Sequence, residues 1–406
     1  MSFLGSAGGV RQAGAKLLRH RMIAATTGAA AAVIVAGCAF AASSAHASGQ
    51  ANLAGDSTTA GDSSTSPAAA TGPLRLLSVS PAGGAKDANG GDPIKLTFSS
   101  ALSASTPLPT ISPKTAGSWK VSGNTATFTP ASGFLPDTAV TVQVPGAMSG
   151  ASDSAGTLAK SAGFTFTTGS YSTLRLQQLL AQLGYLPLTW TPATLGTGST
   201  GGTLADQAAA AYDPPAGTFT FQSGYPTELT SQWKLGASNK LDTGAIRAFE
   251  SDQGLTMDGE AGPDVWSHLL AAAVKDTVNP NGYTYALATQ NSPNETLQVW
   301  HNGKVVLDTA ANTGIPAANT ADGTFPVYER LKFQVMKGAN PDGTKYADPV
   351  YWISYFNGGD AVHYFDRASY GSYQSLGCVE LPMTQAKFIW PYLTYGTLVT
   401  VTGPVA

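Results

Sequence analysis

The stretch DAVHYFDRASYGSYQSLGCVELP, residues 360–382, decides how the C-terminal part of the chain is interpreted. It contains His363 and, fifteen positions later, Cys378, which ends the sequence SLGC. The chain has 2 cysteines, and the other one, Cys38, lies in an N-terminal apolar segment. An unpaired thiol in an exported protein is either reactive or part of an intermolecular bridge, whereas a buried cysteine can act simply as a small hydrophobic side chain.

The residues around Cys378 favour a nucleophilic thiol. A thiol attacks a carbonyl carbon efficiently when a neighbouring base takes its proton, and His363 is the candidate base. Small residues before the nucleophile, Ser375 and Gly377, allow backbone N–H groups to converge on the oxyanion of a tetrahedral intermediate. We therefore expect the amides of Gly377 and Cys378 to form an oxyanion hole.

This stretch resembles the catalytic signature of the L,D-transpeptidases of the YkuD family, in which a His precedes a Ser/Thr-His-Gly-Cys sequence. Upstream, Thr313-Gly314 and the segment DGTFPV at 322–327 are similar to the TG…TPxGxF segment of that family. The resemblance covers roughly residues 281–403, and it implies a β-rich, sandwich-like catalytic domain.

The resemblance also implies a function, the cross-linking of peptidoglycan. Cys378 would attack the carbonyl between the third residue of a stem tetrapeptide and its terminal D-Ala, and an amine of another stem would resolve the thioester. His363 would act as the base, Tyr364 would orient it through its backbone carbonyl, and Ser375 would steady the turn. The expected partners are stem peptides and the cell wall, with carbapenem-type β-lactams as inhibitors.

Three residues depart from the family pattern: Leu376 replaces a His, Tyr364 a Gly or Ser, and Glu380 an Arg or Asn. The earlier His, kept here as His363, is the base in the family, so the loss of the later one does not remove the chemistry. A glutamate near the nucleophile would repel a substrate carboxylate, and Arg367 is the residue that we expect to supply the missing positive charge.

Two other functions remain open. A Cys-His peptidoglycan amidase or carboxypeptidase would use water to resolve the same thioester. A non-catalytic wall-binding protein would carry a decayed site at Cys378, although both His363 and Cys378 are retained. Titration of the thiol separates these interpretations, since a depressed pKa of Cys378 favours catalysis and an inert thiol favours decay.

Residues 1–47 read as a secretory signal or membrane anchor. Basic residues precede an apolar run over 22–42, and the sequence AHA at 45–47 offers a cleavage site. Alternatively, Cys38 follows the sequence VAG, which resembles a bacterial lipobox, and would be lipidated. Each alternative predicts an exported protein at the cell wall or the outer face of the cytoplasmic membrane of a bacterium, with a possible membrane tether through this segment.

Composition limits the partners. The chain carries a net charge of −3 and 12% charged residues, which argues against nucleic acid as a partner. No His, Cys and carboxylate side chains occur at the spacing of metal ligands, no glycine-rich phosphate loop follows a strand into a helix, and no serine nucleophile elbow is present. We therefore expect neither a metal nor a cofactor.

Two regions precede the helical part of the chain. Residues 48–73 are rich in Ala, Gly, Ser and Thr and predict a flexible linker. Residues 74–169 contain short runs of alternating apolar residues separated by turn residues, the pattern of a small β-sandwich. They resemble the bacterial Ig-like domains that often precede L,D-transpeptidase domains, and we expect them to act as a spacer or wall contact.

Residues 171–275 change to a helical period. The sequences LQQLLAQLGY, AIRAFESDQGLTMDG and VWSHLL resemble a peptidoglycan-binding domain of the three-helix type, split by an insertion over about 189–232. The other interpretation is an ordinary small helical domain whose apolar residues are core.

Residues 281–403 return to strand-like alternation and predict a mainly β domain with one helix over 384–392. Aromatic residues flank the expected site. Among them we expect Tyr351 and Phe356, together with Arg367, to bind substrate.

Overall fold

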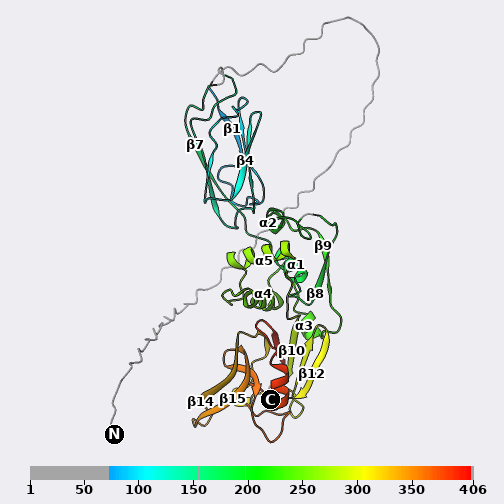
Figure 1. Ribbon diagram of the computed structural model, residues 1–406. Helices are drawn as coiled ribbons and strands as arrows, with labels where there is room; N and C mark the ends of the chain where they lie inside the picture. The colour runs from blue at the N-terminus through cyan, green and yellow to red at the C-terminus, as the bar shows by residue number, and fades with distance from the viewer. Residues whose placement is uncertain (1–72, 153–155, 197, 404–406) are drawn as a thin grey trace, which may run out of the picture. The chain divides into compact units, whose positions relative to one another are not determined.

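The structure is a computed structural model that describes residues 73–152, 156–196 and 198–403. The signal or anchor predicted for 1–47, and the predicted linker except for residue 73, lie outside the described residues. Within those ranges no helix combines the length and apolar character needed to span a membrane. The described chain is multidomain and mainly β, as predicted, with a helical middle region (Figure 1).

The first region is a sandwich of two antiparallel sheets. Its strands are β1 (Leu76–Ser80), β2 (Ile94–Phe98), β3 (Thr110–Ser112), β4 (Gly117–Ser122), β5 (Thr125–Pro130), β6 (Ala139–Val144) and β7 (Ala162–Thr167). The sheets have the orders β1-β2-β5-β4 and β3-β6-β7. Alternate residues such as Ile94, Leu96 and Phe98 are fully buried between them, because side chains of a strand point alternately to its two faces. The predicted β-sandwich is confirmed.

The middle region contains the three predicted helices and an ordered insertion. The helices are α1 (Thr173–Gln182), α4 (Lys240–Gln253) and α5 (Pro263–Lys275). The insertion contains β8 (Leu188–Pro192), α2 (Leu204–Tyr212), β9 (Gly217–Phe221) and α3 (Thr227–Thr230). Helix α4 begins at a capping box between Asn239 and Asp242 and ends at Gly254, whose φ of 67° is the left-handed conformation that glycine adopts most easily.

Buried polar side chains of α1 hold the following chain against that helix. Arg175 donates to Oε1 of Gln207 at 2.6 Å, Gln178 donates to the carbonyl of Pro215 at 2.8 Å, and Gln177 donates to the carbonyl of Lys234 at 2.9 Å. Periodicity identified the apolar face of α1, but it gave no sign that its polar face is buried as well.

The C-terminal region consists of two sheets and a short helix. The first sheet, of order β12-β11-β10-β18-β13, contains β10 (Thr284–Thr289), β11 (Thr296–His301), β12 (Lys304–Ala310), β13 (Gly323–Pro326) and β18 (Leu398–Thr402). The second sheet, of order β14-β15-β16-β17, contains β14 (Glu329–Ala339), β15 (Lys345–Asn357), β16 (Asp360–Tyr364) and β17 (Val379–Leu381). A 3-10 turn, η2 (Pro316–Ala318), precedes β13, and helix α6 (Met383–Ile389) follows β17.

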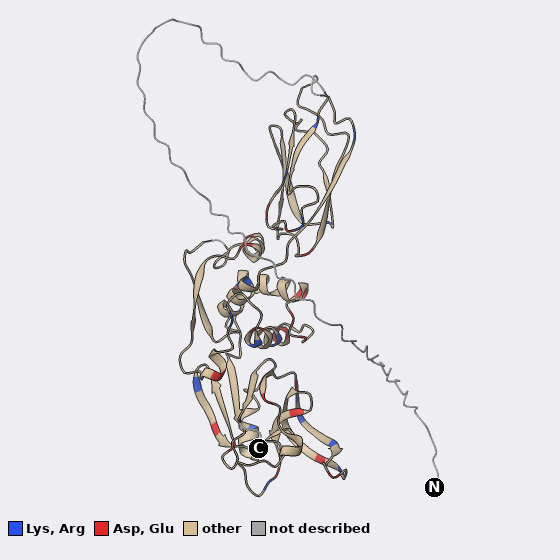
Figure 2. Ribbon diagram, turned by 180° about the vertical axis from the view of Figure 1, so that it is seen from behind, with Lys and Arg blue, Asp and Glu red and all other residues tan. Residues whose placement is uncertain are grey.

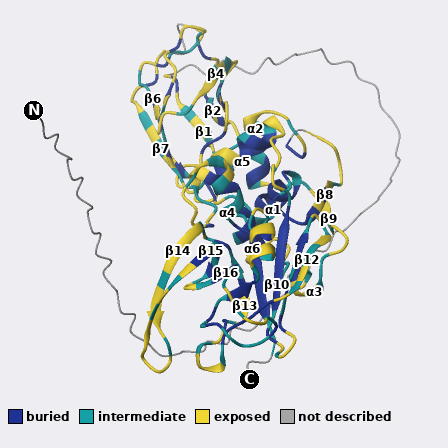
Figure 3. Ribbon diagram, turned by 60° about the horizontal axis from the view of Figure 1, so that its bottom comes forward, coloured by how far each residue is buried: buried dark blue, intermediate teal, exposed yellow. Residues whose placement is uncertain are grey.

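These two sheets pack around one core. Ala286, Leu297 and Val399 of the first sheet lie in the same buried cluster as Val362 and Val379 of the second sheet, and α6 contributes to that cluster too. Strand β10 is buried along most of its length, whereas β14 of the β14–β15 hairpin is largely exposed (Figure 3). The sandwich therefore leaves the hairpin as one wall beside β16 and β17.

The other face of the first sheet is covered by the helical region. Tyr285, Trp300 and Leu398 of this sheet belong to the same buried cluster as Leu241 and Phe249 of α4. The side chain of Gln232 also donates to Oγ1 of Thr324 on β13, at 2.7 Å. The two regions thus share one hydrophobic core.

Candidate active site

Two parallel strands bring His363 and Cys378 to one face of the second sheet. Strand β16 pairs with β17 in the register that places His363 opposite Glu380. Cys378 lies two residues before Glu380, so both side chains point to the same face. All three residues line one cavity of about 600 Å³, together with side chains of the β14–β15 hairpin such as Met336 and Tyr346.

The turn that presents Cys378 is closed by Ser375. The Ser375 hydroxyl donates to the carbonyl of Cys378 at 2.6 Å and accepts a hydrogen bond from the amide of Gly377 at 3.2 Å. Gly377 has a φ of 119°, a conformation reserved for glycine, and a Cβ there would collide with Oδ1 of Asp360. Because the Gly377 amide binds Ser375, only a change in this turn would free it for an oxyanion.

The Thr313-Gly314 segment anchors this turn from the side of the first sheet. The carbonyl of Thr313 accepts hydrogen bonds from the amides of Gln374 and Ser375, and the carbonyl of Ser375 accepts one from the amide of Ile315. Gly314 forms a parallel bridge with Ser375. The two sequence segments that carried the family resemblance therefore meet at the turn that presents Cys378.

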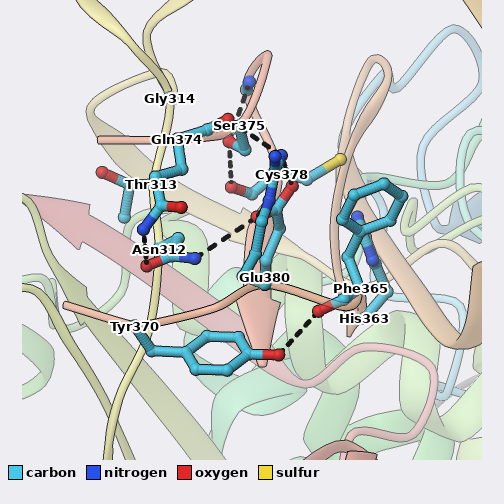
Figure 4. A network of polar contacts seen from close by, with 12 residues as sticks. Asn312, Thr313, Gly314, His363, Phe365, Tyr370, Gln374, Ser375, Cys378 and Glu380 are labelled. Atoms are coloured by element: carbon cyan, nitrogen blue, oxygen red, sulfur yellow. Dashed lines mark hydrogen bonds and ion pairs between the residues drawn. The ribbon is translucent and has the colours of Figure 1, made fainter. Parts of the chain in front are cut away.

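Asn312 organises the loop that leads into the turn. Its side-chain oxygen accepts from the amide of Gly371 at 2.9 Å and from Nε2 of Gln374 at 3.1 Å. Its backbone exchanges two hydrogen bonds with Glu380, from Asn312 N to Glu380 O at 3.0 Å and from Glu380 N to Asn312 O at 2.9 Å. Figure 4 shows this network with the Cys378 sulfur on the side where Phe365 and His363 lie.

Arg367 and Glu380 form an ion pair in the cavity wall. Nε of Arg367 donates to one carboxylate oxygen of Glu380 and Nη2 to the other, at 2.8 Å each. Nη2 also donates to the carbonyl of Gln374 at 2.9 Å, and the guanidinium lies 4.6 Å from the centre of the Phe365 ring. Arg367 lines the cavity and its charge is balanced by Glu380, whereas its role in substrate binding stays a prediction.

His363 is buried, and its imidazole is oriented by one backbone carbonyl. Its side chain is 3% exposed, and Nδ1 lies 3.0 Å from the carbonyl of Tyr364. Because a carbonyl only accepts hydrogen bonds, Nδ1 carries the proton and Nε2 keeps the free lone pair. Burial lowers the pKa of His363, and this effect outweighs the Tyr364 carbonyl and the Glu380 charge, which raise it.

The Cys378 thiol donates a hydrogen bond to a backbone carbonyl at the cavity. The thiol is half-buried, and Sγ lies 3.7 Å from the carbonyl of Gly359, to which it donates. Burial, with smaller contributions from the charges of Asp360 and Glu380, raises the pKa of Cys378 to about 12, although the nearby Ala361 amide lowers it. A thiolate paired with a cation would instead have a lowered pKa.

Two predicted substrate-binding residues lie elsewhere. Phe356 is 2% exposed and packs in the core between the two sheets. Tyr351 is exposed on β15, where the centre of its ring lies 4.9 Å from that of Phe333 with the two rings tilted. Neither is among the residues that line the cavity of Cys378. Strand alternation explains both positions, because a single sequence does not reveal which face of the long hairpin looks into the cavity.

Sequence reasoning missed two residues of the site. Asp360 lines the cavity beside Gly377, and Asn312 holds the turn. Sequence reasoning also expected Glu380 to repel a substrate carboxylate, whereas Glu380 binds Arg367. The sequence did contain a clue to this ion pair. Glu380 is acidic at a position where the family has a cation, so a cationic side chain near it was to be expected. In the described part of the chain no group of three His, Cys, Asp or Glu side chains is arranged to hold a metal ion.

Family models match two parts of the chain. Residues 284–401 match the L,D-transpeptidase catalytic domain and residues 70–168 match a bacterial Ig-like domain. The chain therefore contains both kinds of domain, as the resemblance predicted. Neither match covers the helical region at 171–275, and no peptidoglycan-binding domain was found. No curated protein is similar enough to the chain to count as a match.

Solved L,D-transpeptidase structures resemble the chain at low similarity. An L,D-transpeptidase from Mycobacterium smegmatis is 14% identical, with coverage of 82% of this chain and 100% of that one and a TM-score of 0.27. The protein LdtMt1 in complex with imipenem is 16% identical, with coverage of 80% and 98% and a TM-score of 0.27. The catalytic domain of the Enterococcus faecium L,D-transpeptidase is 29% identical, with coverage of 29% and 96% and a TM-score of 0.27.

Proposed function

We propose that the protein is an exported, cysteine-dependent L,D-transpeptidase that cross-links or remodels peptidoglycan stem peptides and releases terminal D-Ala. The observation that carries the proposal is that Cys378 and His363 line one cavity inside the segment 284–401 that matches the L,D-transpeptidase family model. Export rests on the sequence of residues 1–47.

The first half of the reaction forms a thioester. Sγ of Cys378 attacks the carbonyl carbon between the third residue of the stem and D-Ala, and the thiol proton passes to Nε2 of His363. Collapse of the tetrahedral intermediate breaks the C–N bond, and His363 returns the proton to the departing amine of D-Ala. The carbonyl of Tyr364 keeps the imidazole in the tautomer that this step needs.

The second half releases the acyl group. The side-chain amine of another stem attacks the thioester carbon, its proton passes through His363, and the C–S bond breaks to restore the Cys378 thiol. Water in place of the amine would give a carboxypeptidase. The shared intermediate explains why these two activities differ only in the acceptor.

The raised pKa of Cys378 constrains how acylation proceeds. A thiol with a pKa of about 12 holds its proton at neutral pH, so proton transfer to His363 accompanies the attack. The lowered pKa of His363 suits this order, because the imidazole is neutral and ready to accept. Before attack, Sγ must turn from the Gly359 carbonyl towards His363.

The same observations favour one rival function. A thiol that donates to a backbone carbonyl and resists ionisation is also what a decayed site would contain. The protein would then be a non-catalytic wall-binding protein. The retained His363 tautomer favours the enzyme, because a decayed site has no need of an oriented base.

For the helical region we propose binding to peptidoglycan. Support comes from the order and spacing of α1, α4 and α5, which follow the resemblance to a three-helix wall-binding domain. Sedimentation with purified sacculi tests this, and a protein that stays in the supernatant at all salt concentrations contradicts it.

The test of the catalytic proposal is intact-mass spectrometry after incubation with imipenem, paired with an assay of D-Ala release from a stem tetrapeptide. The wild-type chain is expected to gain one adduct that maps to Cys378 and to release D-Ala. Cys378→Ser should do neither, and His363→Ala should be slowed by at least about 100-fold. A folded wild-type protein with a free thiol that gives neither adduct nor product would point to the binding protein.

A further inference from the structure

Glu295 is a fully buried carboxylate that the proposed reaction does not use. It lies directly before β11 and is 0% exposed. Charged side chains are scattered over the described chain without gathering into a patch of one sign (Figure 2), and Arg367–Glu380 is the single ion pair among the described residues. Glu295 therefore has no cationic partner there, and burying such a group is costly unless hydrogen bonds hold it.

The hydrogen bonds that hold the Glu295 side chain come from Thr313. Oε2 of Glu295 accepts from the Thr313 amide at 2.6 Å, and Thr313 is itself 0% exposed. Burial raises the pKa of Glu295, and this effect outweighs the Thr313 amide and hydroxyl, which lower it. A carboxylate that accepts from a backbone amide forms one of the stronger hydrogen bonds in a protein, so Glu295 fixes the position of Thr313.

Thr313 carries this restraint to the turn that presents Cys378. The Thr313 carbonyl accepts from the amides of Gln374 and Ser375, at 2.9 and 3.0 Å. The Ser375 hydroxyl in turn donates to the carbonyl of Cys378 at 2.6 Å. Thr313 and Ser375 thus connect the Glu295 carboxylate to the Cys378 backbone.

The backbone of Glu295 is held by contacts that do not involve its side chain. The Glu295 amide donates to the carbonyl of Gly371 at 3.1 Å, and the Glu295 carbonyl accepts from the amide of Ala311 at 3.0 Å. A side-chain substitution at Glu295 leaves these backbone bonds in place. Its effect therefore reports on the contact with Thr313.

From these contacts we infer that Glu295 is a positioning residue for Cys378, because its carboxylate fixes Thr313 and Thr313 fixes the turn that presents the thiol. The inference rests on the proposed function, in which Cys378 is the nucleophile. Attack on a carbonyl carbon requires Sγ at a near-attack distance and angle, and a misplacement of about 1 Å can cost about 100-fold in rate. Glu295 does not line the cavity of Cys378, so it acts only through Thr313 and Ser375.

Two substitutions separate the reach of the side chain from its charge. Glu295→Asp keeps the charge but shortens the side chain by a methylene group, so the carboxylate retreats from the Thr313 amide. Glu295→Gln keeps the length and an oxygen acceptor without the charge. We expect Glu295→Asp to lower the rate of imipenem acylation by about 10- to 100-fold, and Glu295→Gln to stay within about fivefold of the wild-type rate.

Glu250→Asp is the matched control. Glu250 is also 0% exposed and also accepts from a backbone amide, that of Gly259 at 2.9 Å, but it lies on α4. Its shortening should cost stability, whereas the acylation rate should remain within about twofold of wild type. If Glu295→Asp fails to fold, Thr313→Val replaces it, because it removes the hydroxyl from the same contact, with an expected decrease of about 3- to 10-fold.

Two further measurements distinguish positioning from general destabilisation. Hydrogen exchange of the Gln374 and Ser375 amides, the donors to Thr313, should become about tenfold faster in Glu295→Asp and stay unchanged in Glu250→Asp. Alkylation of Cys378 by iodoacetamide requires only an accessible thiolate, so it should change by less than about twofold. An equal loss of acylation and alkylation would mean that the thiol itself has changed, and it would overturn the positioning role.

The outcomes separate this inference from the proposed function. A folded Glu295→Asp variant that is acylated at the wild-type rate, or faster than Glu295→Gln, overturns the inference and leaves the transpeptidase proposal intact. A wild-type protein that gives neither an imipenem adduct nor D-Ala overturns the proposed function. The exchange measurement then decides the inference alone, since unchanged exchange at Gln374 and Ser375 in Glu295→Asp overturns it and faster exchange supports the hold of Glu295 on the turn.

Discussion

The guanidinium of Arg367 binds both carboxylate oxygens of Glu380, at 2.8 Å each, and the Glu380 side chain is only 5% exposed. Removing one partner leaves the other charge unpaired, so Arg367→Ala should lower the free energy of unfolding by about 3 kcal/mol. The Arg367→Ala, Glu380→Ala double variant should lose less than the sum of the single variants. Urea unfolding of the full double-mutant cycle measures this coupling, and purely additive losses would contradict it.

Gly377→Ala should destabilise the turn that presents Cys378 more than a glycine substitution elsewhere. The new Cβ would collide with Asp360 and force an alanine into a φ of 119°, at a cost of about 3 kcal/mol. Gly343→Ala at the hairpin tip is the control, because a Cβ there meets nothing within 4 Å although φ is 84°, and it should cost about 1 kcal/mol. Equal losses in thermal unfolding would refute the close approach to Asp360.

Ser375→Ala should slow acylation without removing the thiol. The substitution deletes the hydrogen bonds that tie the Cys378 carbonyl and the Gly377 amide together, so the turn no longer holds Sγ in one position. We expect a decrease in the rate of imipenem acylation of about 10- to 100-fold. Ser372→Ala, on the same loop but outside the cavity, should stay near the wild-type rate. Thiol counting under denaturing conditions confirms that Cys378 is intact.

The reactivity of Cys378 towards iodoacetamide should rise throughout the alkaline range. Because burial raises the pKa of the thiol to about 12, the thiolate fraction in the substrate-free protein increases about tenfold per pH unit from pH 7 to pH 10. The rate of alkylation, followed by intact mass, measures that fraction. A plateau below pH 9 would instead identify a thiolate already paired with His363.

Glu250 should make the helical region less stable as the pH rises. Its carboxylate accepts a hydrogen bond from the Gly259 amide at 2.9 Å, and burial raises the folded-state pKa from 4.5 to about 7. Between these two pKa values the folded state therefore binds more protons than the unfolded state. The stabilisation that the Glu250 proton contributes is fully present below the unfolded-state pKa and is lost as the pH rises through 7.

We accordingly expect Glu250→Gln to raise the melting temperature at pH 8 by a few degrees and to have little effect at pH 5. Glu260→Gln, which changes an exposed residue in the loop that contains Gly259, is the matched control. The same gain at both pH values in Glu250→Gln would contradict an origin in protonation.

Much of the fold was predictable because its strands and helices carry local signals. The alternation around Ile94 and around Val140 identified strands of the sandwich, and Pro263 marked the first residue of α5. The insertion gave no such signal. The fold of the insertion depends on buried contacts with Arg175 and Gln178, which are distant from their partners in the sequence.

The residues of the candidate site were likewise predictable only in part. His363, Ser375, Gly377 and Cys378 lie in one sequence segment, so a motif identifies them together. The partner of Arg367 and the positions of Tyr351 and Phe356 depend on which strand faces are buried, and the pairing of β14, β15 and β16 decides that. Spacing along the sequence contains no information about these faces.

The core shared by Tyr285, Trp300 and Leu398 with α4 makes the catalytic sheet dependent on the helical region. Trimming the chain to the segment 284–401 would expose a face of aromatic and aliphatic side chains to water and invite aggregation. The smallest piece expected to behave well in isolation therefore begins near residue 171, where the helices that cover this sheet begin.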